Sequence, residues 1–305
     1  MKIKSLINCV ALSGLSVALA GCGGGGGGVA SMPTPPTPPT SGGSTTTNAS
    51  TAVELFSNPA TQEFATVGTG APLRVRYDAG SDKYEVNTGA GQWSALIDDP
   101  SFSPLPGNPN VSFIIGGGGF LMIRAHYAYP AEFQYRYSNL AVWGGAPGAN
   151  GQTVGGYTAI GIPTAAANVP RTGSATYQGL IEGGSTVLCD CGWDPGQKAL
   201  ATIGGSALLT FDFGQGTLSG GLHPYLDAEK RYDLGTLAFA NTVFGVGSQT
   251  FSGTFATNLS GPNAFSGLFT GANAQELIGN WSFPFTYPLD GSLQSATGAM
   301  IAKRP

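Results

Sequence analysis

The chain has 305 residues, a formal net charge of −4 and 10% charged residues, while glycine alone contributes 49 residues. A mildly acidic chain of this kind argues against nucleic acid, and against an anionic headgroup surface, as a partner. Low charge with abundant Gly, Thr, Ser and Phe is typical of antiparallel β-structure with many turns, not of helices. We therefore expect an all-β protein.

Residues 1–21 have the two parts of a secretory signal peptide, a positive start at Lys2 and Lys4 and an uncharged apolar stretch from Leu6 to Ala20. The stretch ends in Leu19-Ala20-Gly21-Cys22, which resembles the lipobox of bacterial lipoproteins. The resemblance implies that Cys22 carries a covalent diacylglycerol and an acyl chain, which anchor the chain to a membrane; no other cofactor is expected. The alternative is an ordinary signal peptide with a cysteine near its end.

Residues 22–50 form a low-complexity linker, and this favours the lipoprotein interpretation. Six glycines follow Cys22, then the proline-rich stretch 33–39 and a Ser/Gly/Thr run to about Ser50. Such a composition cannot bury apolar surface and serves as a spacer. The residue after the cysteine is Gly23, whereas an aspartate there is the usual signal for inner-membrane retention, so we expect the outer membrane. Loss of Lys2 and Lys4 leaves 11 basic and 17 acidic residues, a net charge of −6.

Residues 51–169 show strand-like segments between turn-rich loops, and we expect a small irregular β domain here. The segments Val53–Phe64, in this region, and Tyr225–Leu234, further along, are candidates for one or two helical turns. The expected strands are Leu73–Tyr77, Lys83–Val86, Val111–Ile115, Phe120–Tyr127 and Tyr135–Trp143.

Residues 170–305 have a more regular pattern of about eight short strands with alternating apolar side chains. An up-and-down barrel removes the edges that such a meander would expose, and eight strands enclose an interior that side chains just fill. We therefore predict an eight-stranded antiparallel β-barrel. Its expected strands are Gly173–Leu180, Ala199–Phe213, Gly216–Leu222, Thr236–Phe244, Ser248–Asn258, Ala264–Phe269, Glu276–Phe285 and Ser292–Lys303. The candidates for the interior are Phe211, Phe213, Phe251, Phe255, Phe269, Trp281 and Phe283.

Four segments of this region, in the same order, resemble the barrel domain of transferrin-binding protein B and related surface lipoproteins. Pro170–Gly179 is similar to the family's opening strand, Phe211–Gly220 to its central "DFGxGTLxG" hairpin, Gly267–Gly279 to "GxFxGPxAxExGG", and Gly298–Arg304 to its closing strand. Ala272 stands where the family usually has proline, and Ile278 replaces a glycine. The stretch from Tyr135 to Pro163 resembles the handle portion that precedes such barrels.

The resemblance implies a surface-exposed lobe, built of a handle and a barrel, that binds a protein ligand through its loops. Relatives capture iron carriers or complement proteins of a host, often beside a membrane receptor. We therefore expect capture of an iron- or haem-carrier protein, with a TonB-type outer-membrane receptor as a further candidate partner. The alternative function is that of a small-molecule carrier using the barrel interior.

Cys189 and Cys191 are the two cysteines that remain after signal removal and lipidation. In an extended strand, residues two apart are too distant for a disulfide, but Gly192-Trp193-Asp194-Pro195-Gly196 places the pair in a turn-rich loop. Because export makes oxidation plausible, we predict a local disulfide that stiffens this loop. A redox or soft-metal site is the alternative.

Few other residues suggest chemistry, and we predict no enzymatic activity and no metal site. The two histidines, His126 and His223, lack a metal-ligand spacing, and no Gly-x-Ser-x-Gly motif occurs. Glu276 is the one patterned acid, and a structural ion pair with Lys303 or Arg304 is its expected role. Aromatic side chains are the candidate interaction residues, although packing of the handle against the barrel would also explain them. These candidates are Tyr127, Tyr129, Tyr135, Tyr137 and Trp143.

Overall fold

The computed structural model describes residues 62–70, 72–81, 83–89, 92–98, 110–115, 118–124, 135–147, 153–191 and 198–305. These residues form two antiparallel sheets joined by a connection that contains the short 3-10 helix η3 (Ala166–Asn168). The fold is therefore all-β, as predicted. Among the residues described, no helix has the length and apolarity needed to cross a bilayer.

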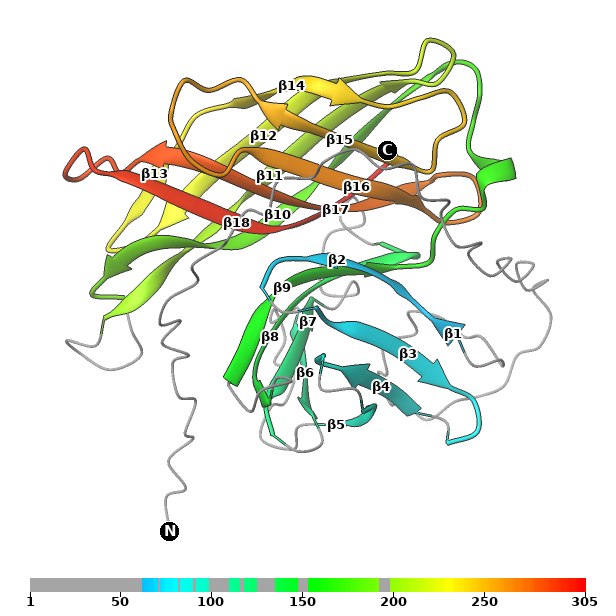
Figure 1. Ribbon diagram of the computed structural model, residues 1–305, viewed down its shortest axis with the longest axis horizontal. Helices are drawn as coiled ribbons and strands as arrows, with labels where there is room; N and C mark the ends of the chain where they lie inside the picture. The colour runs from blue at the N-terminus through cyan, green and yellow to red at the C-terminus, as the bar shows by residue number, and fades with distance from the viewer. Residues whose placement is uncertain are drawn as a thin grey trace, which may run out of the picture.

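The first sheet, called the handle below, follows the chain from β3 to β9 and then closes with the first two strands (Figure 1). β1 pairs with β3, and β2 pairs with β9. Phe64 is the single residue between β1 and β2, so this short segment connects the β3 edge of the sheet to its β9 edge. The amide of Phe64 donates to the carbonyl of Val75 at 2.9 Å. The strands are β1 (Gln62–Glu63), β2 (Ala65–Gly68), β3 (Arg74–Asp78), β4 (Lys83–Asn87), β5 (Ser94–Asp98), β6 (Asn110–Ile115), β7 (Phe120–Arg124), β8 (Ser138–Pro147) and β9 (Thr153–Gly161).

The handle is the small β domain that the sequence predicts, and it has its own apolar core. Alternate residues of its strands point inward, because successive side chains of a strand face opposite sides of the sheet. Val75 on β3, Leu121 on β7 and Trp143 on β8 are buried in this way. The predicted strands exist at β3, β4, β6, β7 and β8, whereas β1, β2, β5 and β9 were missed.

The second sheet is a closed eight-stranded barrel, as predicted, because β11 pairs with β10 on one side and with β12 on the other. The short β13 continues from β12 as a hairpin, so the predicted helical turns at Tyr225–Leu234 were wrong; most of Val53–Phe64 lies outside the described residues. The strands are β10 (Ser174–Cys189), β11 (Ala199–Asp212), β12 (Thr217–Asp227), β13 (Arg231–Asp233), β14 (Leu237–Val243), β15 (Thr250–Phe255), β16 (Ala264–Thr270), β17 (Glu276–Thr286) and β18 (Leu293–Lys303).

The barrel interior is occupied by the aromatic rings that the alternation predicted. All seven candidates are at most 2% exposed, so the predicted register is confirmed. The ring centroid of Phe211 lies 4.8 Å from that of Phe269 and 5.1 Å from that of Phe251. Edge-to-face pairs at such distances add to the gain from burial. Several strands are longer than expected, and β10 continues to Cys189 instead of ending near Leu180.

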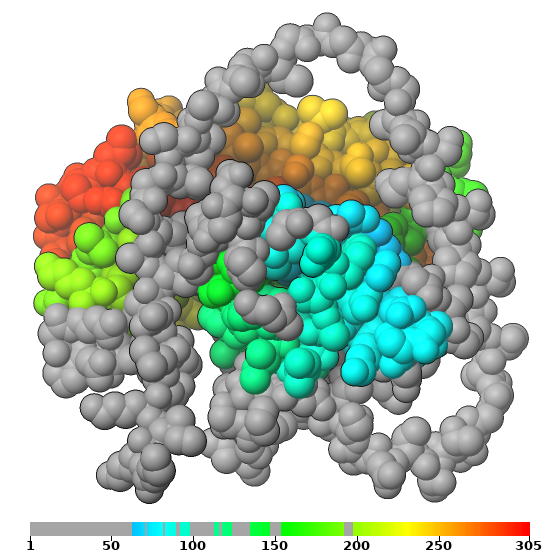
Figure 2. All heavy atoms as spheres, turned by 60° about the horizontal axis from the view of Figure 1, so that its bottom comes forward, coloured from blue at the N-terminus to red at the C-terminus, as the bar shows by residue number. Residues whose placement is uncertain are grey.

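The handle packs mainly on the outer face of β17 and β18, with β9 also contacting β10, and Figures 1 and 2 show it lying along one side of the barrel. An apolar cluster forms this junction. It contains Tyr135, Leu140 and Ala159 of the handle region and Ile278, Ala299 and Ile301 of the barrel. Because these barrel side chains point away from the aromatic interior, the outer face of the barrel is apolar where the handle covers it.

Candidate functional site

Glu276, at the start of β17, connects the barrel to the handle. Its carboxylate accepts hydrogen bonds from the backbone amides of Arg136 at 2.6 Å and Tyr137 at 2.9 Å. The side chain is only 4% exposed, and this burial raises the pKa of the carboxyl group, against the opposite effect of the two amides and of Lys303. Two backbone amide groups thus fix the carboxylate. The expected ion pair with Lys303 or Arg304 does not account for these two hydrogen bonds.

Other polar contacts extend this junction along the last turn before β17. The hydroxyl groups of Ser138 and Thr270 share a hydrogen bond of 2.7 Å, and the Thr164 hydroxyl donates to the carbonyl of Gly271 at 2.7 Å. Asn280 donates its side-chain amide to the carbonyl of Gly68 at 3.3 Å. The junction is therefore both apolar and hydrogen-bonded, which favours a fixed orientation of the handle on the barrel.

Three of the five candidate interaction aromatics lie among the residues that the structure describes, and two of these three are buried. Tyr135 and Trp143 are 5% and 2% exposed, so their assignment as exposed interaction residues was wrong. Trp143 belongs to the handle core, because β8 directs it inward, while Tyr135 lies in the junction cluster. Tyr137 is half-buried against Gly271. Tyr127 and Tyr129 lie outside the described residues.

An aromatic side chain that the sequence analysis missed lies on the outside of the handle. Trp93 is half-buried, and the guanidinium carbons of Arg76 and Arg74 lie 4.3 Å and 5.1 Å from its ring centroid. Arg74 pairs with Glu63 and Arg76 with Glu85, each at 2.6 Å. Glu63 also raises the pKa of Arg74. Arg74 and Arg76 lie on either side of the inward-facing Val75 on β3. This alternation in the sequence could have predicted that the two arginines point outward together.

A groove of about 350 Å³ lies on the outer surface where the handle meets the barrel. Val67 of β2 forms part of its wall, and β15, β16 and the connection after β14 form the rest. All of the lining side chains are uncharged. The Ser266 hydroxyl donates to the side-chain oxygen of Asn280 at 2.7 Å, and the Ser248 hydroxyl donates to the carbonyl of Thr250 at 2.7 Å. These two hydroxyl groups of the groove are therefore already hydrogen-bonded within the protein.

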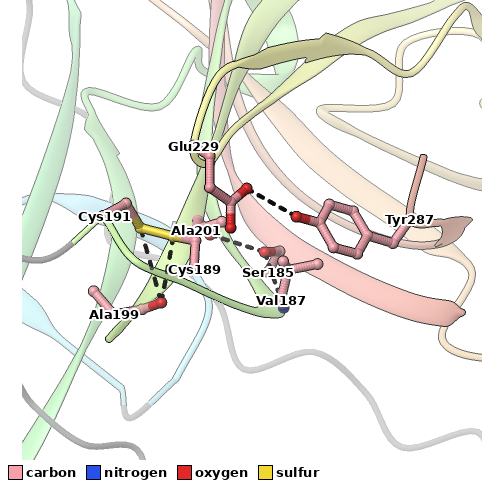
Figure 3. Close-up of a disulfide and its surroundings, with 8 residues drawn as sticks. All are labelled: Ser185, Val187, Cys189, Cys191, Ala199, Ala201, Glu229 and Tyr287. Carbon is pink, nitrogen blue, oxygen red and sulfur yellow. Dashed lines mark hydrogen bonds between the residues drawn. A yellow bond between two sulfur atoms is a disulfide. The ribbon is translucent and has the colours of Figure 1, made fainter. Parts of the chain in front are cut away.

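The two cysteines lie at the end of β10, where their sulfur atoms are bonded (Figure 3). Their Cα atoms are 5.1 Å apart. Cys189 is 1% exposed and belongs to the barrel core, whereas Cys191 is exposed. Nearby, the Tyr287 hydroxyl donates to Glu229 at 2.9 Å, and burial together with this carboxylate raises the pKa of Tyr287 to about 12.

Residues with catalytic or metal-binding chemistry are sparse in the described part of the chain. His223 is 53% exposed and lies 3.3 Å from Asp233, at the surface of the barrel. His126 and Cys22 lie outside the described residues. Among the residues described, no group of three or more His, Cys, Asp or Glu side chains could hold a metal ion.

A family model matches one domain of this chain. Residues 169–304 match the family model described as the C-lobe and N-lobe β-barrels of Tf-binding protein B. A comparison with curated proteins found no match.

Solved structures of transferrin-binding protein B are also similar. A mutant of the protein from Haemophilus parasuis Hp5 is 15% identical, with a TM-score of 0.43, over 80% of this chain and 44% of that chain. The isotype 1 protein from serogroup B Neisseria meningitidis is 16% identical, with a TM-score of 0.42, over 80% of this chain and 43% of that chain. This chain therefore spans less than half the length of these relatives.

Proposed function

We propose that this chain, whose C-terminal domain is a β-barrel of the transferrin-binding protein B type, is a lipid-anchored binding protein that catalyses no reaction. The observation that carries this proposal is the match of residues 169–304 to the barrels of that family. The similar solved proteins are named for transferrin, so an iron-carrying protein is the first ligand class to test, and a haem carrier is the second. Because the chain spans less than half of those proteins, transferrin binding is itself part of the proposal.

The proposed location is the outer face of the outer membrane, with a lipid on Cys22 and the linker of residues 22–50 as the tether. A second acyl group makes such an anchor stable, because a single chain binds a bilayer only marginally. A tether of this composition holds the folded part clear of the headgroups and lets it meet a large ligand. A TonB-type receptor in the same membrane is the proposed second partner.

The packing of the barrel supports a ligand at the surface instead of inside it. Phe211 contacts five other rings at centroid distances of 4.8 to 6.0 Å. Rings at these distances fill the space that a carrier would leave for a small molecule. The alternative function, a carrier that uses the barrel interior, would require this cluster to separate and is not favoured.

The proposed contact surface on the handle is the patch formed by Trp93, Arg74 and Arg76. Tryptophan and arginine are the side chains most enriched where protein interfaces gain their energy. Trp93 already contacts two guanidinium groups, and Glu63 and Glu85 form ion pairs with those groups in turn. A ligand would therefore meet a preorganised aromatic side chain, which lowers the entropy cost of binding.

The test uses residues 22–305 with Cys22→Ser, immobilised and exposed to iron-loaded transferrin and, separately, to haemoglobin. We expect saturable binding of one of them, and a loss of at least about tenfold in affinity in Trp93→Ala. Tyr225→Ala is the matched control, because Arg231 stacks on that ring at 4.0 Å on the barrel, away from the handle. Its affinity should equal that of the parent protein.

The possible results separate the parts of the proposal. Failure of both carriers to bind contradicts the proposed ligand classes. Binding that Trp93→Ala and Tyr225→Ala reduce equally, or not at all, contradicts the contact surface but leaves the binding function intact. Circular dichroism of each variant establishes that a loss of binding is not a loss of folding.

A further inference from the structure

The disulfide at the end of β10 joins two residues in different surroundings. Cys189 is the last inward-facing residue of the strand and is 1% exposed, within the apolar core of the barrel. Cys191 follows after a single intervening residue, Asp190, and is exposed to solvent. One cysteine is thus open to reagents in solution, while the other is shielded by the barrel.

This bridge adds little to the stability of the fold. A disulfide stabilises a protein mainly by restricting the unfolded chain, and the effect grows with the number of residues in the closed loop. The sequence separation here is 2, so the bridge closes one of the smallest loops a chain can form. It also links no two strands, because Cys189 is the last residue of β10 and Cys191 lies just beyond it.

The end of β10 is held in place by other contacts. The ladder to β11 continues through Leu188 opposite Leu200 and Cys189 opposite Ala199. Before it, the Ser185 hydroxyl donates to the carbonyl of Ala201 at 2.9 Å and accepts from the amide of Val187 at 3.2 Å (Figure 3). A reduced Cys189 would remain in the core as a small apolar side chain. The fold can therefore hold the oxidised and the reduced pair.

We propose that Cys189 and Cys191 form a thiol–disulfide exchange site for low-molecular-weight thiols, and not a structural cross-link. The thiolate of such a thiol attacks Sγ of Cys191, because that sulfur is exposed, and a new S–S bond forms there. The Cys189–Cys191 bond breaks, its electron pair stays on Sγ of Cys189, and that sulfur takes up a proton from water. Thiolates exchange with disulfides through mixed disulfides of this kind.

A second molecule of the thiol completes the exchange. Its thiolate attacks the external sulfur of the mixed disulfide and releases Cys191 as a thiolate, which is then protonated. Two external thiols have become one external disulfide, and the bridge has gained two electrons and two protons. The reverse sequence, with an external disulfide as oxidant, restores the bridge.

The experiment uses residues 22–305 with Cys22→Ser, in which Cys189 and Cys191 are the remaining cysteines. Free thiols are counted by alkylation and mass spectrometry, first in untreated protein and then after incubation with glutathione under native conditions. We expect no free thiols at first, two after reduction, and none again after oxidised glutathione is added. We expect the melting temperature to change by no more than about 3 °C between the two states.

Two single variants identify the sulfur that reacts. With oxidised glutathione under native conditions, Cys189→Ser should form a mixed disulfide on Cys191. Cys191→Ser should react at least about tenfold more slowly, because its thiol is buried, and should reach the same rate after denaturation. Two free thiols in untreated protein, a bridge that is reduced only after unfolding, or equal native rates in the two variants would overturn the proposal.

Discussion

Single residues show how closely the barrel and the handle depend on each other. Glu276 occupies a patterned position in the sequence, which predicts an ion pair within the barrel. The structure gives it two backbone partners, the amides of Arg136 and Tyr137, which lie 140 and 139 residues away in the chain. No local pattern predicts such partners, because backbone amides carry no sequence signature.

The first prediction concerns the removal of this carboxylate. Glu276→Ala leaves two amide groups at a buried junction without an acceptor, and each unsatisfied group costs roughly 1–3 kcal/mol. We expect the free energy of unfolding to fall by about 2–4 kcal/mol, measured by urea denaturation. The control, Asp227→Ala, removes a 52% exposed carboxylate that lies 4.0 Å from the guanidinium group of Arg231. It should change the free energy of unfolding by less than about 0.5 kcal/mol. Equal losses in the two variants would refute the role of Glu276.

The second prediction concerns pH. The pKa of Glu276 is raised in the folded protein, mainly by burial, so the folded state binds this proton more tightly than the unfolded state does. The parent protein should therefore gain stability relative to Glu276→Gln as the pH falls from neutral toward 4.5, the ordinary pKa of glutamate. Urea titrations of both proteins across this range measure the difference. The quantity compared is the free energy of unfolding of the parent protein minus that of Glu276→Gln. If this difference stays constant or decreases as the pH falls, burial does not dominate.

At the scale of strands, glycine makes room for the aromatic interior. Trp281 on β17 lies beside Gly183 of β10 and Gly298 of β18, and a Cβ atom at either glycine would collide with its indole ring. The indole nitrogen donates to the carbonyl of Ala299 at 3.0 Å, and the ring stacks on Phe283 at 5.0 Å. The abundance of glycine in this chain thus has a packing cause in the barrel.

The third prediction tests this arrangement. Gly298→Ala places a methyl group against the ring of Trp281 and against the backbone of Glu182, and we expect a loss of about 1–3 kcal/mol in the free energy of unfolding. Gly245→Ala is the control, since nothing lies within 4 Å of its added Cβ atom, and it should have little effect. Thermal and urea unfolding of both variants provide the comparison, and a tolerated Gly298→Ala would contradict the packing account.

The strand pattern was predictable where large side chains alternate and was missed where glycine replaces them. The alternating Phe251 and Phe255 predicted β15, and both side chains point inward as expected. β9 was missed because Gly155 and Gly156 give it a weak strand signal. Neighbouring backbone passes so close to these glycines that a Cβ atom would not fit. The reason for those glycines lies in tertiary packing, which the local sequence does not contain.

In the molecule as a whole, a handle followed by a barrel is predictable from the sequence, whereas the way the handle closes is not. Closure of the handle depends on a segment that Phe64 divides, with β1 paired to β3 and β2 to β9. Two- and four-residue strands leave too short a pattern to recognise. The proposed contact surface around Trp93 was missed for a related reason, since its arginine partners come from another strand.

Protease treatment of intact cells tests the proposal that Cys22 anchors a binding domain that faces the outside of the cell. We predict that the protease removes the tagged parent chain from whole cells while a periplasmic marker protein stays intact, and that Cys22→Ser is no longer retained in the membrane fraction. A parent chain that resists the protease in whole cells and is digested only after lysis would contradict surface display.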